Sequence, residues 1–94
     1  MLEDVFEELR TMRLCDSGNR FSLDWLRQNE SYMRTLKFQK AKPSARVILR
    51  CAHRLQSQGQ ALSASDFPTI RDKGQRLNEL AQACFNEAIR QSQF

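Results

Sequence analysis

The chain has few of the residues that break helices or form tight turns. Only three Gly and two Pro occur among its 94 residues. It also lacks a run of about four to eight β-branched or aromatic residues alternating with polar ones, so no strand or hairpin is indicated. These absences predict an all-α protein. At this length we expect one domain, with a core that removes about 60 to 65 % of the unfolded chain's surface from water.

Cysteine is sparse and has no pairing pattern. The three thiols, Cys15, Cys51 and Cys84, are odd in number and show no C-x-x-C spacing. A zinc site and a disulfide framework are therefore not indicated, and a reducing compartment is favoured. Cys51 and Cys84 fall in apolar helical phase, which predicts small core residues. We expect no metal and no cofactor.

Membrane and catalytic patterns are missing as well. No stretch has the long apolar run of a spanning helix or the charged start of a signal peptide, so a cytoplasmic protein is expected. The sequence offers no paired carboxylates and no Gly-rich phosphate loop. Its single histidine, His53, has no Ser, Cys or carboxylate at a motif spacing. We interpret His53 as a partly exposed structural residue and do not expect an enzyme.

Positive charge, by contrast, is concentrated in the middle of the chain. Residues 20–54 carry a net charge of +7, whereas residues 1–19 carry −3 and residues 55–94 are neutral, which together give the chain's +4. A polyanion would meet the middle segment first. The alternative is a solvated basic face without a partner.

Apolar periodicity and turn signals divide the chain into five expected helices. The first is amphipathic, with acidic residues in its first turns, and is expected to brace the middle segment. We interpret residues 56–65 as a polar connector in which Gly59 stops a helix. Gly74, inside the last helix, predicts a bend or a close approach of another helix. The expected helices span residues 2–13, 19–27, 30–39, 44–56 and 66–91.

Residues 22–55 carry a pattern of paired apolar positions around a basic turn. Met33 and Leu36 form an apolar pair, Lys42-Pro43-Ser44 separates two helices, and an apolar face follows it. That face consists of Ile48, Leu49, Ala52 and Leu55. The segment resembles the helix-turn-helix of the lambda-repressor and Cro group of DNA-binding proteins. Arg27 stands where that pattern has a turn glycine, and Phe21-Ser22 stands one residue before the place of its Leu-Ala pair, which an extended or bulged first helix would accommodate.

This resemblance implies a five-helix, lambda-repressor-like domain with a long C-terminal helix. The helix-turn-helix core would occupy residues 19–56, and residues 66–91 would form a packing and dimerisation helix of the single domain 1–94. The whole chain also resembles a small alphaproteobacterial family of the same length class, from which no function follows.

The resemblance also assigns residues to roles. Short polar and basic side chains at the start and outer face of helix 30–39 would read bases, since such groups match the hydrogen-bonding edges of the major groove. Neighbouring cations and free helix N–H groups would bind phosphates. The base-reading set is Gln28, Asn29, Ser31, Arg34 and Thr35. The phosphate-binding set is Lys37, Lys40, Lys42, Ser44 and Arg46. A contact between subunits is expected from Leu77, Cys84, Phe85, Ala88 and Ile89.

The sequence therefore favours a sequence-specific protein that binds double-stranded DNA, a small transcriptional regulator of bacterial or phage type that acts as a homodimer. The second hypothesis is a non-enzymatic adaptor or inhibitor that uses the same scaffold to bind a protein. An enzyme is a distant third.

Overall fold

The computed structural model describes residues 1–92, within which the chain forms five α-helices and one π-helical segment. In chain order they are α1 (Leu2–Thr11), α2 (Gly18–Arg20), η1 (Phe21–Trp25), α3 (Tyr32–Gln39), α4 (Ala45–Ser63) and α5 (Pro68–Gln91). The prediction of an all-α chain with five helices and a long C-terminal helix is confirmed. The molecule measures 42 × 31 × 17 Å along its principal axes.

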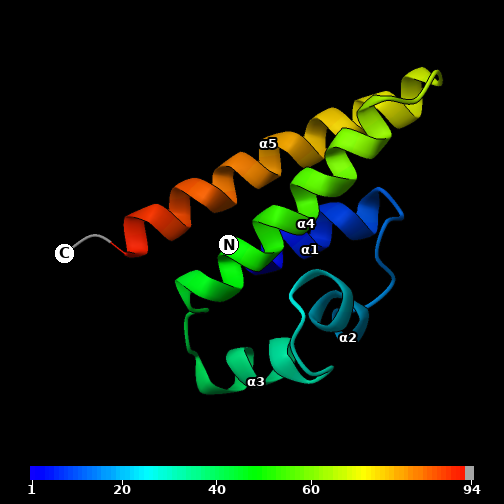
Figure 1. Cartoon of the computed structure of the whole chain (residues 1–94). Helices are drawn as coiled ribbons and strands as arrows, with labels where there is room; N and C mark the ends of the chain where they lie inside the picture. The colour runs from blue at the N-terminus through cyan, green and yellow to red at the C-terminus, as the bar shows by residue number, and fades with distance from the viewer. Residues whose placement is uncertain (93–94) are drawn as a thin grey trace.

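The two longest helices, α4 and α5, form an antiparallel hairpin that makes up one side of the molecule (Figure 1). The predicted connector at residues 56–65 is wrong, because α4 continues through Gly59 to Ser63. Gly59 is buried against α5, where it faces Gly74. A Cβ atom on Gly74 would lie 2.4 Å from the Ser63 nitrogen and 2.8 Å from the Gly59 carbonyl oxygen. Gly59 therefore permits close helix packing rather than ending a helix, and the close approach expected at Gly74 is confirmed.

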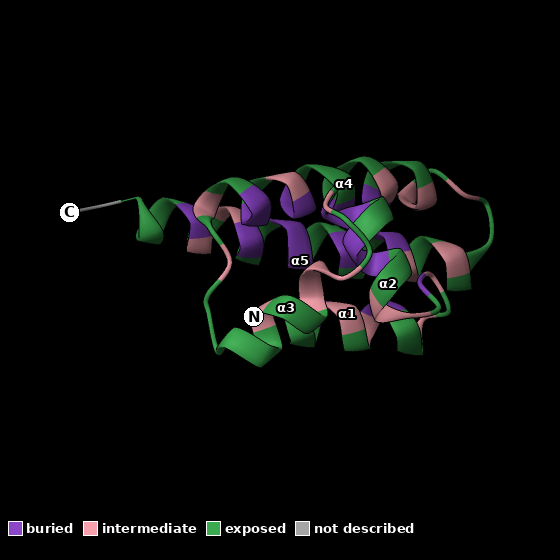
Figure 2. Ribbon diagram, turned by 90° about the horizontal axis from the view of Figure 1, so that it is seen from below, coloured by how far each residue is buried: buried purple, intermediate pink, exposed green. Residues whose placement is uncertain are grey.

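A single core lies where α1, η1, α4 and α5 meet, and its residues cluster on the facing sides of these helices (Figure 2). Trp25, predicted to be core, is 6 % exposed, and Cys51 and Cys84 are fully buried as predicted. The adjacent Cys84 thiol and burial raise the pKa of the Cys51 thiol, which therefore stays protonated at neutral pH. Other fully buried side chains include Leu9, Phe21, Leu26, Ile48, Leu55 and Leu77.

Helix α1 braces the remaining elements, as expected. The Phe6 ring lies 5.5 Å from the Phe21 ring of η1, measured between centroids. On the other side, the Arg76 guanidinium of α5 donates to the Glu8 carboxylate at 2.6 Å. The helix ends two residues earlier than predicted because Arg13 adopts a left-handed conformation with φ 60°.

Among residues 1–92, no helix combines the length and apolarity needed to cross a bilayer.

Candidate nucleic-acid interface

Helix α3, predicted at residues 30–39 and observed at Tyr32–Gln39, lies at the end of the molecule remote from the α4–α5 connection (Figure 1). It contains no buried residue. Only one side of it leans on the core, through the half-buried side chains of Tyr32 and Met33. Its opposite side is open to solvent, so α3 is free to contact a partner.

A buried serine fixes the start of α3. Ser22 is fully buried, and its hydroxyl accepts a hydrogen bond from the Met33 N–H at 3.2 Å. The same hydroxyl donates to the Gly18 carbonyl at 2.9 Å. Ser22 therefore joins the helix formed by α2 and η1 to the first turn of α3. Because a buried hydroxyl without partners is costly, this pair of bonds defines the placement of α3.

The five predicted base-reading residues divide into two groups. The Asn29 side-chain oxygen accepts from the Ser31 N–H at 3.0 Å and from the Ser31 hydroxyl at 2.8 Å. The Gln28 amide donates to the Leu26 carbonyl at 3.4 Å. These three side chains shape the turn before α3. Arg34 and Thr35 are exposed on the helix and form no side-chain hydrogen bond within residues 1–92, so the structure leaves these two free to reach a partner.

Phe38 is a feature of this surface that the sequence reasoning missed. Its side chain is 89 % exposed, the highest value among the exposed large hydrophobic residues of the described chain. It stands one helical turn after Arg34, on the side of α3 that points away from Tyr32 and Met33. The helical periodicity of the sequence already places Phe38 opposite the core-facing positions, so its exposure could have been predicted.

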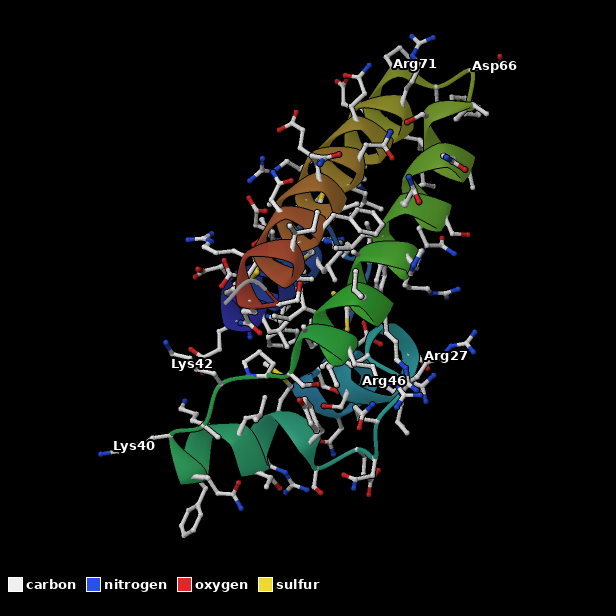
Figure 3. All side chains as sticks on the ribbon, turned by 60° about the vertical axis from the view of Figure 1, so that its left-hand side comes forward. Arg27, Lys40, Lys42, Arg46, Asp66 and Arg71 are labelled. Carbon is white, nitrogen blue, oxygen red and sulfur yellow. The ribbon has the colours of Figure 1, made fainter. Side chains whose placement is uncertain are left out.

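Among residues 1–92, the cations around α3 form no ion pair. In residues 1–92, the arginines that form ion pairs are Arg10, Arg20, Arg76 and Arg90. None of the eight Lys and Arg residues between positions 27 and 54 does so in this part of the chain. Four of the five predicted phosphate-binding residues belong to this unpaired group, namely Lys37, Lys40, Lys42 and Arg46. Figure 3 shows Lys40 and Lys42 on one side of the junction between α3 and α4 and Arg46 on the other.

The remaining predicted phosphate ligand, Ser44, caps α4. Its hydroxyl accepts from the Val47 N–H at 3.3 Å, which uses one of the free donors at the helix start. Lys40, at the end of α3, adopts φ 52°, and its N–H donates to the Lys37 carbonyl at 3.3 Å. The turn that carries Lys42 is therefore held from both ends.

Acidic residues of α1 form the border of this surface on one side. A hollow of about 300 Å³ beside α3 is lined by Arg34 and Lys37 on one wall and by Glu3, Asp4 and Glu7 on the other. These carboxylates form no ion pair with either cation among the described residues. A polyanion would be repelled along this border, so its approach to α3 is favoured from the side away from α1.

The predicted dimerisation residues lie mostly inside the fold. Leu77, Cys84 and Ala88 are buried in the core that α5 shares with α4, with exposures of 0 %, 0 % and 2 %. Phe85 is half-buried and Ile89 is 54 % exposed. Leu77, Cys84 and Ala88 therefore stabilise the hairpin within one chain. Of the predicted dimerisation residues, only Phe85 and Ile89 remain accessible to a second subunit.

The fold and this surface describe a small all-α domain with an exposed, basic end. The chain belongs to a family of unknown function (DUF6626), whose model matches residues 2–94. Comparison with curated proteins and with solved structures gave no significant match.

Proposed function

We propose that the protein binds double-stranded DNA sequence-specifically, as a small transcriptional regulator that inserts α3 into the major groove. The observation that carries this proposal is the free state of the α3 region. The helix has no buried residue, and the five cations Arg34, Lys37, Lys40, Lys42 and Arg46 in and around it form no ion pair within residues 1–92. Neutralising phosphates is the interaction that such a surface satisfies best.

Two local features support a helix-turn-helix arrangement of η1 and α3. The Leu26 N–H donates to the Phe21 carbonyl at 3.2 Å, which is the wider hydrogen-bonding pattern of a π-helix. This turn holds one residue more than an α-turn, as the one-residue offset of Phe21-Ser22 from the lambda-repressor pattern requires. Arg27, at the place of that pattern's turn glycine, has φ 54°, the left-handed conformation that glycine adopts most readily.

The free side chains of α3 suit base edges. Arg34 can donate two hydrogen bonds to guanine, and the Thr35 methyl and the Phe38 ring can each contact a thymine methyl. The cations on the two sides of α3 would bind the phosphates that border the groove and so fix its register. In a two-fold dimer, two copies of α3 would enter successive major grooves about 34 Å apart.

Selection of bound sequences from a random duplex pool, with light scattering for mass, tests the proposal. We expect an inverted-repeat site, a doubled mass, and an affinity that falls by roughly three to five orders of magnitude between about 50 and 200 mM salt, as for about eight phosphate contacts per dimer. No duplex binding, or binding that does not respond to salt, would overturn it.

Two variants separate the expected roles. Arg34→Ala should relax base preference at one position of each half-site by about 1–3 kcal/mol. Lys40→Ala with Lys42→Ala should instead weaken all duplexes alike and lower the salt slope by about 2 per copy, or about 4 for the dimer. The matched control is Arg71→Ala with Lys73→Ala, which removes the same charge on α5. Arg71 lies at the far end of the hairpin (Figure 3). If the control weakened duplex binding as much as the lysine double variant does, net charge and not the position of the lysines would determine the affinity.

Phe38 also favours the second candidate, a protein-binding adaptor. A large aromatic side chain at 89 % exposure is a typical anchor for a protein partner. A stoichiometric protein recovered from native cells, whose binding is lost in Phe38→Ala while mobility shifts with DNA stay blank, would replace the DNA proposal with this one.

A further inference from the structure

A shallow hollow of about 320 Å³ lies between η1, the turn that follows it and the middle of α4. None of the α3 residues Arg34, Thr35 and Phe38 lines it. Within the part of the chain that the structure describes, its walls contain three arginines and no carboxylate. The six lining residues are Trp25, Arg27, Arg50, His53, Arg54 and Ser57.

The three arginines place like charges together without compensation. Arg50 and Arg54 are one helical turn apart on α4, a spacing at which equal charges destabilise a helix. Arg27 adds a third guanidinium from a different element. Within residues 1–92 none of the three forms an ion pair. An anion in the hollow would relieve this repulsion from all three at once.

Aromatic contacts hold two of the lining side chains in place. The Arg54 guanidinium carbon lies 5.5 Å from the centre of the Trp25 ring. Stacking by its face leaves the N–H groups at the edge of a guanidinium free to donate. The His53 ring meets the Phe85 ring edge-on at 5.3 Å between centroids. These donors therefore lose little freedom when a ligand binds, which favours affinity.

Arg27 provides an independent indication. It adopts φ 54°, where a non-glycine residue is strained, whereas glycine would fit there without steric strain. Strained conformations of this kind are concentrated at binding and catalytic sites. Of the three non-glycine residues with positive φ, Arg13, Arg27 and Lys40, Arg27 is the one that lines the hollow. This is the arrangement expected if its guanidinium contacts a ligand.

We propose that this hollow binds a phosphoryl group. Guanidinium groups match phosphate oxygens in pairs, and three of them with the His53 and Ser57 donors suit a compact, multiply charged phosphate. The group could belong to a soluble phosphorylated molecule or to a nucleic-acid backbone. The proposal does not depend on base reading by α3.

Trp25 is the only tryptophan of the chain, so its fluorescence reports on the hollow directly. The full chain is titrated with inorganic pyrophosphate at constant ionic strength, with sodium chloride as the reference salt and calorimetry as a second readout. We expect a saturable change with pyrophosphate and none with chloride. If neither fluorescence nor heat shows saturable binding, the proposal is overturned.

Two variants locate the binding. Arg50→Gln and Arg27→Gly should each weaken pyrophosphate binding by about tenfold or more, the loss expected for a hydrogen bond to a charged group. The matched control is Arg13→Gly, which also replaces an arginine at positive φ but does not line the hollow. It should change affinity less than about twofold. Equal losses in Arg13→Gly and Arg27→Gly would place the anion elsewhere and overturn the proposal.

A labelled duplex distinguishes the two sources of the phosphate. If a backbone phosphate occupies the hollow, pyrophosphate should compete with the duplex, and Arg50→Gln should weaken both. If a soluble molecule occupies it, Arg50→Gln should weaken pyrophosphate binding alone, and the duplex should not compete. Both results support the site, and the second stands even if the protein binds no DNA.

Discussion

The α4–α5 hairpin and the α3 region are built from similar amphipathic segments but use them differently. Between α4 and α5, the buried glycines Gly59 and Gly74 bring two backbones together, and Leu55 and Leu77 of the same two helices are fully buried. Helix α3 contributes no buried residue and is held mainly by the Ser22 hydroxyl and two half-buried side chains. The hairpin and its neighbours thus supply stability, whereas α3 presents a surface. Five predictions, each with its own variant or pair of variants, test this division.

The largest expected difference is between two phenylalanines. Phe21 is fully buried and Phe38 is 89 % exposed. Phe21→Ala should lower the free energy of unfolding by about 3–5 kcal/mol because it leaves a cavity in the core. Urea unfolding followed by circular dichroism measures it. A loss below about 1 kcal/mol would show that the core is not centred on η1.

Gly74→Ala should cost about 1–3 kcal/mol through overpacking against the α4 backbone. The sign is informative, because helix propensity alone would make this change stabilising by about 1 kcal/mol. Gly18→Ala is the matched control, since an added Cβ there meets nothing within 4 Å. Thermal melts of both variants would show whether α4 and α5 are as close as described.

Ser22→Ala should cost about 1.5 kcal/mol, because the Met33 N–H loses its buried acceptor. Besides lowering the free energy of unfolding of the whole protein, the substitution should destabilise the start of α3 locally. Amide hydrogen exchange should accelerate in the first turn of α3 while α4 and α5 remain protected. Uniform acceleration in all helices would instead mean that α3 unfolds only together with the core.

Arg27→Gly and Arg13→Gly should each raise the free energy of unfolding, by about 0.5–1 kcal/mol. Both residues have positive φ, and glycine removes the steric strain of that conformation at a smaller cost in chain entropy. Differential scanning calorimetry would detect the shift in Tm. If both variants gain stability but only Arg27→Gly loses pyrophosphate binding, Arg27 is identified as a residue that contacts the ligand.

Phe38→Ala should change the free energy of unfolding by less than about 0.5 kcal/mol, as expected for an exposed position. Its effect should instead appear in DNA or partner binding. A stability loss comparable with that of Phe21→Ala would contradict the separation between the two regions.

Helical periodicity was enough to predict α1, α3 and α5 to within about two residues, because each has an uninterrupted apolar stripe. Periodicity gave the wrong helix end at Gly59, because a glycine can either end a helix or permit close packing of two helices. That choice depends on Gly74 of the opposite helix, which lies on a different segment of the chain.

The candidate sites were predictable only in part. Net charge located the basic segment, and the exposed positions of Arg34 and Thr35 agree with helical phase. The side chains of Asn29 and Ser31 bond each other at the exposed turn before α3, so their polar groups already have local partners, which short-range sequence patterns leave open. The hollow could not be predicted, since Arg27 meets Arg50 and Arg54 only through the folding of η1 against α4.

The absence of buried side chains in α3 has an evolutionary consequence. Selection can alter positions such as Arg34, Thr35 and Phe38 without repacking anything beneath them. If α3 is the recognition element proposed above, recognition and folding are uncoupled, and a chimera that exchanges this outward face between homologues should inherit the donor's target on an unchanged scaffold.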